Sequence, residues 1–263
     1  MPVTVRHVRA FKERGERFVM LTAYDFPTAG ILDRAGVPVI LVGDSVADNE
    51  LGYPSTLPVT MQEMLHHTRA VVRGVDNALV VGDMPFMSYQ VSLEEGIRSA
   101  GRFLKEGGAA AVKIEGPAIE LAAALVERGI PVMGHLGLTP QSVNAMGGLR
   151  VQGRTEEDAR KLVDHADALS KAGAFAIVLE AMPGEVAKRI TETVSVPTIG
   201  IGAGPHCDGQ VLVINDLLGL GPRPLPKFAK AYADLRGEIE RAARDFTEDV
   251  REGRFPDAAH SYE

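Results

Sequence analysis

Short runs of apolar residues alternate with amphipathic stretches along the chain, and glycine or proline separates them. The run at 39–42, Val-Ile-Leu-Val, has no polar alternate positions, which is typical of a parallel strand covered on both faces. Strands are predicted there and at 18–23, 78–81, 110–114, 130–133, 175–179, 197–201 and 210–214. Helices are predicted at 27–35, 60–73, 92–105, 118–128, 156–172, 185–193 and 226–251. The pattern therefore predicts repeated βα units.

At least six of the eight predicted strands end at a polar or ionisable residue. These residues are Asp25, Asp44, Asp83, Glu115, His135 and Glu180. In a (β/α)₈ barrel the catalytic groups come from the carboxyl ends of several strands, whereas a doubly wound sheet concentrates them at one switch point. We therefore expect a (β/α)₈ TIM barrel. The chain has no linker rich in proline or serine, which favours a single domain over residues 1–263.

Two long polar segments, 46–58 and 136–154, interrupt the repeat and are expected to be loops. Loops of this length at the edge of a site often contact substrate or close over it. Thr60 and Glu63 follow the first of them with the spacing of a capping box, which places the start of the next helix.

Asp44 and Asp83 share one context, an apolar run followed by glycine and then aspartate. A single such aspartate is more often a turn or helix-capping residue, but the repetition favours a shared site. Two converging carboxylates suit a hard divalent cation such as Mg²⁺, and Glu115 is a candidate for a third or supporting ligand. Zinc is the weaker choice, because Cys207 is the only cysteine and no histidine pair has zinc-ligand spacing.

Lys113 and Glu115 lie two positions apart on one predicted strand, so both side chains point to the same side. A surface ion pair is the alternative, but the apolar neighbours on this strand make a solvated strand a poor expectation. His135 on its own is more often a core or loop histidine than a catalytic one. Glu180 follows an apolar run, where a carboxylate gains a raised pKa and can serve as a general base.

Composition and charge limit the classes of partner. The 263 residues are 45% hydrophobic and 24% charged, as in a globular protein with a sizeable core. The formal net charge of −7 opposes a broad nucleic-acid surface, which needs clustered Lys and Arg. No stretch has the length and apolarity of a membrane span or a secretory leader, so we expect a cytoplasmic protein with neither membrane nor nucleic-acid partners.

Several sequence blocks, in order along the chain, resemble the ketopantoate hydroxymethyltransferase family. They are LTAYD at Leu21, LVGDS at Leu41, STLPVT at Ser55, PFMSY at Pro85, VKIEG at Val112, GHLGLTPQSVN at Gly134, VQGR at Val151, GIGAG and DGQVLV from Gly200, and PKFAKAYA at Pro226. The resemblance implies a barrel related to phosphoenolpyruvate-utilising enzymes and a large homo-oligomer, typically a decamer. It also implies Mg²⁺ as cofactor and 5,10-methylenetetrahydrofolate as co-substrate. The implied reaction is hydroxymethyl transfer to the keto acid 3-methyl-2-oxobutanoate, through a Mg²⁺-stabilised enolate, in pantothenate biosynthesis.

The resemblance also implies a role for each matching residue. Asp44 and Asp83 would bind Mg²⁺, with Glu115 completing or supporting the site. The keto acid would be held by Asp44, Ser45, Asp83 and Lys113. Glu180 would accept the proton, and His135 would lie near the reacting carbonyl. This chain departs from the family at 46–50, where Val-Ala-Asp-Asn-Glu stands in place of a small, apolar stretch.

Three other functions remain open from the sequence. One is a Mg²⁺-dependent lyase or mutase of the phosphoenolpyruvate-related group, which folate dependence would distinguish. Another is an aldolase that forms a Schiff base through Lys113, which borohydride trapping would reveal. The third is a barrel that has lost catalysis and serves as a binding or assembly protein.

Overall fold

The computed structural model describes residues 2–221 and 224–262 of the chain. The chain divides into two compact units, Met1–Val213 and Ile214–Glu263. The expectation of one domain over residues 1–263 stays a prediction, because such a division does not establish that the units fold separately.

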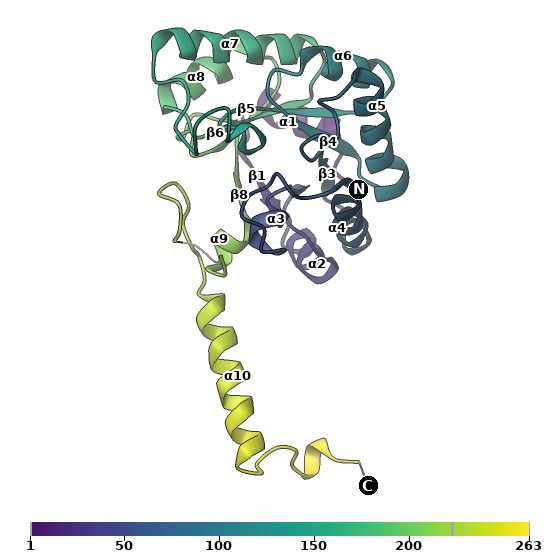
Figure 1. The fold of residues 1–263 in the computed structure, drawn as a ribbon, viewed down its shortest axis with the longest axis vertical. Helices are drawn as coiled ribbons and strands as arrows, with labels where there is room; N and C mark the ends of the chain where they lie inside the picture. The colour runs from purple at the N-terminus through teal and green to yellow at the C-terminus, as the bar shows by residue number, and fades with distance from the viewer. Residues whose placement is uncertain (1, 222–223, 263) are drawn as a thin grey trace. The chain divides into compact units, whose positions relative to one another are not determined.

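The first unit is a closed barrel of parallel strands, in which each strand pairs with the next along the chain and β8 pairs with β1 (Figure 1). The strands are β1 (Phe18–Thr22), β2 (Val39–Val42), β3 (Leu79–Asp83), β4 (Ala111–Glu115), β5 (Val132–Gly137), β6 (Ala176–Glu180), β7 (Thr198–Ile201) and β8 (Gly209–Leu212). The expected eight-stranded barrel is confirmed.

Helices surround these strands, most of them along the outside of the barrel, whereas the first helix packs its Val8 against the core inside it (Figure 1). They are α1 (Val5–Glu13), α2 (Phe26–Arg34), α3 (Val46–Asn49), α4 (Met61–Gly74), α5 (Leu93–Arg102), α6 (Ile119–Glu127), α7 (Glu156–Lys171) and α8 (Gly184–Thr193). A π-helical turn, Phe103–Gly107, continues α5, and a 3₁₀ turn, Pro140–Ser142, follows β5. Thr60 and Glu63 form the expected capping box at the start of α4.

The apolar core lies inside the barrel, below the polar ends of the strands. Its members alternate along the strands: Phe18, Met20, Val39, Leu41, Leu79, Val81, Ala111, Met133, Ala176, Val178, Ile199 and Val211. Val8 of α1 belongs to the same cluster. Because side chains two positions apart on a strand share a face, the inward row of β4 continues from Ala111 to Lys113 and Glu115. The carboxyl end of the barrel thus receives charged side chains above an apolar layer.

Several element boundaries differ from the sequence-based predictions. Helix α1 was not predicted, because it precedes the first strand and belongs to no βα unit. The expected loop at 46–58 begins with the single helical turn α3, since no glycine or proline occurs before Gly52. The strand predicted at 130–133 begins later and extends to Gly137, so His135 lies within β5. At Gly134 a Cβ would lie 2.9 Å from Leu169 Cδ1, so the glycine lets α7 pack closely against β5.

The second unit contains α9 (Ile214–Leu218), α10 (Leu235–Arg251) and a 3₁₀ turn, Ala258–His260. The helix predicted at 226–251 begins only at Leu235, where the side chain of Asp234 accepts from Gly237 N–H. Helix α10 has no buried residue, and Ile239, Phe246 and Val250 on it are exposed.

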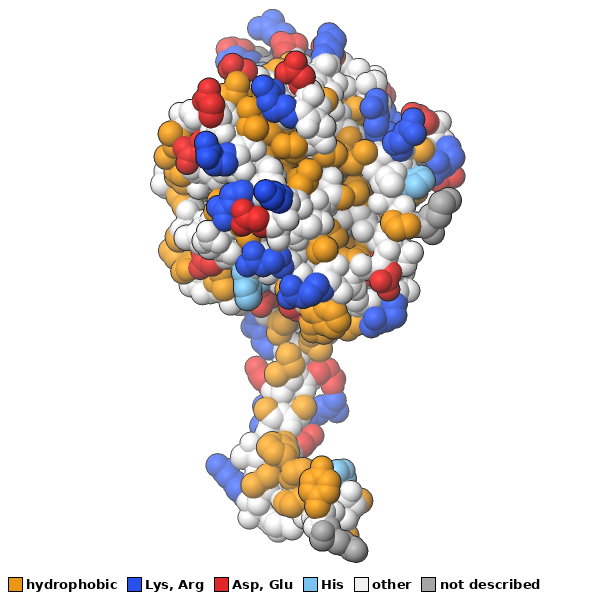
Figure 2. Space-filling view, turned by 90° about the vertical axis from the view of Figure 1, so that its right-hand side faces the viewer, with side chains coloured by type: hydrophobic (Ala, Val, Ile, Leu, Met, Phe, Trp, Pro, Cys, Tyr) orange, Lys and Arg blue, Asp and Glu red, His pale blue; other side chains and the backbone are white. Residues whose placement is uncertain are grey.

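Charged side chains of both signs are interspersed on the barrel face drawn in Figure 2. Of the helices in the described part of the chain, none combines the length and apolarity that a membrane span needs.

Asp33 is a buried carboxylate that fixes the connection into β3. It accepts hydrogen bonds from the backbone N–H groups of Asp76 (3.1 Å), Asn77 (3.1 Å) and Ala78 (2.6 Å). Burial raises the pKa of Asp33, but these donors outweigh burial and hold the pKa below its ordinary value.

We expect Asp33→Asn to lower the free energy of unfolding by about 1–3 kcal/mol at pH 7, because three backbone N–H groups lose a charged acceptor. The pKa of Asp33 is lower in the folded than in the unfolded chain, so its contribution is complete above the unfolded-state pKa. The contribution is lost as the pH falls through the folded-state pKa, so the free energies of unfolding of parent and variant should become equal there. Urea unfolding at several pH values measures this difference. Asp164→Asn, at an exposed position in the middle of α7, is the control. Equal stability of Asp33→Asn and parent at pH 7 would contradict the assignment.

Candidate active site

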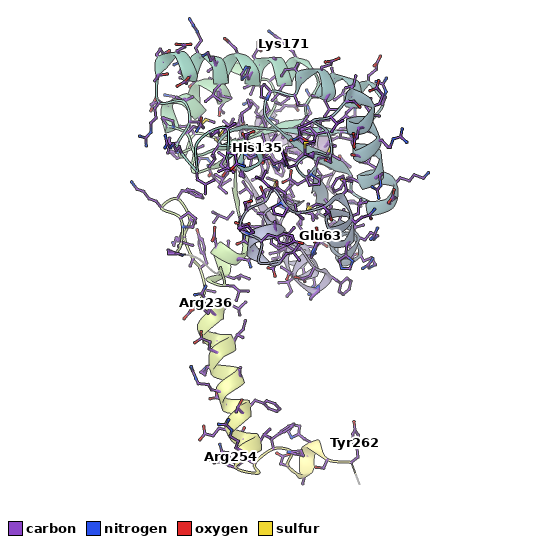
Figure 3. All side chains as sticks on the ribbon, in the orientation of Figure 1. Glu63, His135, Lys171, Arg236, Arg254 and Tyr262 are labelled. Atoms are coloured by element: carbon purple, nitrogen blue, oxygen red, sulfur yellow. The ribbon has the colours of Figure 1, made fainter. Side chains whose placement is uncertain are left out.

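The strand register brings the predicted charged residues together at the carboxyl end of the barrel. Asp83 of β3 is level with Lys113 of β4, and Glu115 of β4 is level with His135 of β5. Glu180 ends β6, the next strand. Figure 3 shows His135 among the barrel strands, whereas Lys171 lies on the outer helix α7. The sequence-based prediction that these strand ends converge is therefore confirmed for five residues.

Lys113 is the central cation of this cluster. Its Nζ lies 2.9 Å from Asp83 Oδ1, 3.8 Å from Glu115 Oε1 and 3.2 Å from His135 Nδ1. Burial lowers the pKa of Lys113, but the charges of Asp83, Glu115 and Asp44 outweigh burial and raise it. A protonated amine is a poor nucleophile, so this environment opposes the Schiff-base alternative.

Asp44 and Asp83 lie side by side, as their shared sequence context predicts. Asp44 N–H donates to Asp83 Oδ2 at 3.1 Å, and both side chains are buried. Burial and the charges of Asp83 and Glu115 raise the pKa of Asp44 well above its ordinary value. Burial also raises the pKa of Asp83, and the charge of Lys113 offsets only part of that rise. These carboxylates are therefore under mutual repulsion.

His135 connects Glu115 with Glu180. His135 Nδ1 lies 3.3 Å from Glu115 Oε1, and Nε2 lies 3.1 Å from Glu180 Oε2. Burial and the charge of Lys113 lower the pKa of His135, but the two carboxylates outweigh them and raise it to about 9. For Glu115, burial raises the pKa, but His135 and Lys113 reverse the shift and lower it. The two neighbouring carboxylates thus favour the protonated form of His135.

Glu180 differs from the other carboxylates of the cluster in its exposure. Its side chain is 17% exposed, whereas the side chain of Glu115 is 3% exposed. Sequence reasoning placed Glu180 among apolar neighbours, and the structure adds the contact with His135. The carboxylate is held on one side and accessible on the other.

Two predicted polar residues lie apart from this cluster or at its edge. Asp25 ends β1 in the sequence pattern, but its side chain is exposed and caps α2 by accepting from Thr28 N–H at 2.8 Å. Its inclusion among the strand-end groups was wrong, because Ala23 and Tyr24 separate it from the strand. Ser45 follows Asp44, and its Oγ lies 2.9 Å from the Tyr24 hydroxyl.

Gln141 and Tyr89 are buried in the site and were not singled out from the sequence. Gln141 Nε2 donates to Asp44 Oδ2 at 2.9 Å, and Gln141 N–H donates to Glu115 Oε2 at 3.0 Å. The Tyr89 hydroxyl accepts from Glu115 N–H at 3.0 Å. Both residues stand in loops after β3 and β5, inside the blocks PFMSY and GHLGLTPQSVN. Their position as polar residues within blocks that match the family could have identified them as candidate site residues.

The donor set suits a divalent cation, although it is not a ready-made cage. Within residues 2–221 and 224–262, no three Asp, Glu, His or Cys side chains are arranged as a metal-ligand group. Asp83 Oδ1 is nevertheless buried without a hydrogen bond of good geometry, although Lys113 is close. The cluster has four carboxylates and only two basic side chains, so a divalent cation would balance the excess negative charge. The carboxylates are those of Asp44, Asp83, Glu115 and Glu180, and the basic side chains are those of Lys113 and His135. Mg²⁺ commonly takes one or two carboxylates, with water and substrate oxygens completing its shell.

Gly137, at the end of β5, allows the backbone of Glu180 to approach closely. Its φ is +96°, and a Cβ there would lie 2.2 Å from the Glu180 carbonyl oxygen. Leu138 N–H donates to that same oxygen at 2.9 Å. The close approach fixes the main chain that carries the Glu180 side chain.

We expect Gly137→Ala to lower the free energy of unfolding by about 1–3 kcal/mol, because the new methyl group meets backbone and the positive φ is strained. Gly101→Ala, in α5, is the matched control. A Cβ at Gly101 meets nothing within 4 Å, so that substitution should stabilise by about 0.5–1 kcal/mol. Urea unfolding measures both, and a Gly137→Ala variant as stable as the parent would contradict the close approach.

Solved structures with the same barrel have low sequence identity to this chain. The phosphoenolpyruvate phosphomutase of Streptomyces platensis subsp. rosaceus matches with a TM-score of 0.62 at 16% identity, over 95% of this chain and 88% of that one. A 2,3-dimethylmalate lyase, described as a PEP mutase/isocitrate lyase superfamily member, matches with a TM-score of 0.61 at 17% identity, over 96% and 89%. These likenesses confirm the TIM-barrel fold.

Relatives of much higher identity share one name. The 3-methyl-2-oxobutanoate hydroxymethyltransferase of Carboxydothermus hydrogenoformans is 57% identical over 262 residues, covering 99% of this chain and 95% of the relative. That of Moorella thermoacetica is 56% identical, covering 99% and 97%. The model of the family described as ketopantoate hydroxymethyltransferase matches residues 2–258. The chain therefore belongs to the ketopantoate hydroxymethyltransferase family.

Proposed function

We propose that this protein transfers a hydroxymethyl group from 5,10-methylenetetrahydrofolate to 3-methyl-2-oxobutanoate. The products are 2-dehydropantoate (ketopantoate) and tetrahydrofolate, which makes the reaction a step of pantothenate biosynthesis. The observation that carries the proposal is the linked cluster of Asp83, Lys113, Glu115, His135 and Glu180 in a chain of this family. It combines a buried cation, converging carboxylates and one accessible carboxylate, which are the groups that enolate chemistry needs.

In this proposal Asp44 and Asp83 hold Mg²⁺, and Glu115 completes or supports the site. The raised pKa of Asp44 and the excess of carboxylates over cations support this assignment. When bound, Mg²⁺ would supply Lewis-acid stabilisation of the negative charge that develops on the keto oxygen.

Lys113 contributes positive charge to substrate binding. Its raised pKa keeps the ammonium protonated, so it attracts the oxygens of the keto acid without forming a covalent bond. Asp44, Ser45, Asp83 and His135 complete the proposed keto acid site.

Glu180 is the proposed proton acceptor. Its Oε2 lies 3.1 Å from His135 Nε2 as an ion pair, and its partial exposure lets substrate reach it. Glu180 removes the proton from C3 of the keto acid, and the enolate forms a carbon–carbon bond with the bridging methylene carbon of the folate as the first of that carbon's two C–N bonds breaks. Water then replaces the second folate nitrogen on this carbon and supplies the hydroxyl oxygen. The two released nitrogens take up the proton from C3 and one proton from water, which gives tetrahydrofolate.

The proposal extends to assembly and location. As the family resemblance implies, the protein would be a cytoplasmic homo-oligomer, a decamer, with small-molecule substrates.

We expect Glu180→Gln to bind the keto acid but to exchange its C3 proton with solvent about 10²–10⁴-fold more slowly than the parent, even without folate. The amide keeps the size of the side chain and removes its basicity. Proton NMR in deuterium oxide measures the exchange. Glu185→Gln, at an exposed position of α8, should exchange at the parent rate. If Glu180→Gln also exchanged at the parent rate, Glu180 would not be the base, and His135 would become the candidate.

Asp44→Ala and Asp83→Ala should each abolish measurable Mg²⁺ binding while the barrel stays folded, because each removes a proposed ligand. Calorimetric titration with Mg²⁺ measures affinity, and circular dichroism monitors the fold. Asp164→Ala, on the exposed face of α7, should bind Mg²⁺ like the parent. Retention of parent affinity by either site variant would remove that aspartate from the ligand set.

A further inference from the structure

Gln141 lies at the centre of a buried hydrogen-bond network that joins three strand ends. Its Nε2 donates to Asp44 Oδ2 at 2.9 Å and to the Met84 carbonyl oxygen at 2.9 Å. Its Oε1 accepts from the Tyr89 hydroxyl at 2.9 Å and from Gln90 Nε2 at 3.2 Å. Both N–H groups and both lone pairs of the amide are used, so a buried side chain is fully satisfied.

The orientation of this amide follows from its partners. The Met84 carbonyl can only accept a hydrogen bond, so the nitrogen of Gln141 must face it and the oxygen must face Tyr89. The Tyr89 hydroxyl donates to this oxygen at 2.9 Å, which agrees with that orientation. The amide therefore has one stable orientation, with Nε2 directed at Asp44.

Gln141 also reaches a second carboxylate through its backbone. Its N–H donates to Glu115 Oε2 at 3.0 Å, while Asp44 N–H donates to Asp83 Oδ2 at 3.1 Å. One oxygen of each of three buried carboxylates is thus held by a neutral N–H donor, and Gln141 supplies two of the three donors. Rotation of these carboxylates about the bond to their carboxyl carbon is restricted. Oδ1 of Asp83 and Oε1 of Glu115 are left facing Lys113.

We propose that Gln141 is a positioning residue that orients Asp44 and Glu115 for the divalent cation, and that Tyr89 acts by holding Gln141. This inference rests on the proposed function. A neutral amide suits the role because it directs a carboxylate without changing the charge of the site. A cationic side chain in its place would weaken the attraction for Mg²⁺, and a carboxylate would add to the repulsion among Asp44, Asp83 and Glu115.

The test replaces Gln141 with methionine, which has a similar unbranched shape and lacks the side-chain N–H donor to Asp44, while the backbone N–H that donates to Glu115 remains. Gln141→Met should weaken Mg²⁺ binding by about 10–100-fold, as is usual for the loss of a residue that orients a metal ligand. Calorimetric titration with Mg²⁺ alone measures this, with circular dichroism and urea unfolding as checks of folding. The KM for the keto acid should rise by a larger factor than kcat falls. Gln62→Met, at an exposed position of α4, should match the parent.

A double-mutant cycle separates positioning from general destabilisation. Tyr89→Phe keeps the ring and removes the hydroxyl, so it should weaken Mg²⁺ binding by about fivefold. If Tyr89 acts through Gln141, the loss of Mg²⁺ affinity in the double variant Tyr89→Phe/Gln141→Met should be smaller than the product of the two single losses. Any additional loss beyond that of Gln141→Met would reflect the bond from Glu115 N–H to the Tyr89 hydroxyl. If the loss of Mg²⁺ affinity in the double variant equals the product of the two single losses, the proposed coupling is overturned. Should Gln141→Met fail to fold, parent affinity in the folded Tyr89→Phe variant would overturn it as well.

Failure of this inference differs from failure of the proposed function. If the parent binds Mg²⁺ and Gln141→Met binds it equally well, the positioning role is wrong and the proposed function stands. If the parent binds no Mg²⁺, the proposed function fails, and the inference fails with it.

Discussion

The buried ammonium group of Lys113 is the feature on which the site depends. Removing a charge from water is costly unless opposite charges and hydrogen bonds compensate it, and loss of one partner of a buried pair typically costs about 3–5 kcal/mol. The contact of 2.9 Å between Lys113 Nζ and Asp83 Oδ1 supplies that compensation. This contact exists because Asp83 and Lys113 are opposite each other in the register of the paired strands β3 and β4. A shift of one residue in that register would turn the charged side chains of one strand toward the outer helices.

From this pair the rest of the cluster follows strand by strand. Glu115 shares the inward face of β4 with Lys113, and His135 is level with it on β5. His135, whose pKa is raised to about 9, then contacts Glu180 at the end of β6. The charges rest on an apolar layer inside the barrel, which excludes water and strengthens each electrostatic interaction. The excess of carboxylates supports the proposed need for a divalent cation, and the partial exposure of Glu180 supports its proposed role as the base.

Much of this arrangement could be predicted from the sequence, because it depends on local periodicity. Uninterrupted apolar runs located the strands, and the repeated glycine–aspartate ending identified Asp44 and Asp83. Asp25 was misassigned because aspartate is common both after a strand and at the N-cap of a helix, and the sequence alone does not separate the two. Gln141 was missed because it stands in an aperiodic loop and contacts Asp44 across 97 positions of sequence. Such contacts depend on how loops fold over the barrel, and no residue spacing encodes them. The start of α10 was predicted too early, at 226 instead of Leu235. The residue pattern before Leu235 is also compatible with a helix, and only the cap at Asp234 sets the boundary.

The central claim is that the buried cluster performs metal-dependent removal of a proton from a keto acid. The most direct test is solvent deuterium exchange into C3 of 3-methyl-2-oxobutanoate, catalysed by the parent protein without folate and followed by NMR with and without Mg²⁺. The account predicts exchange that requires both protein and Mg²⁺ and that is absent after chelation. Exchange at the same rate after complete removal of divalent cations, or no exchange with Mg²⁺ present, would contradict it.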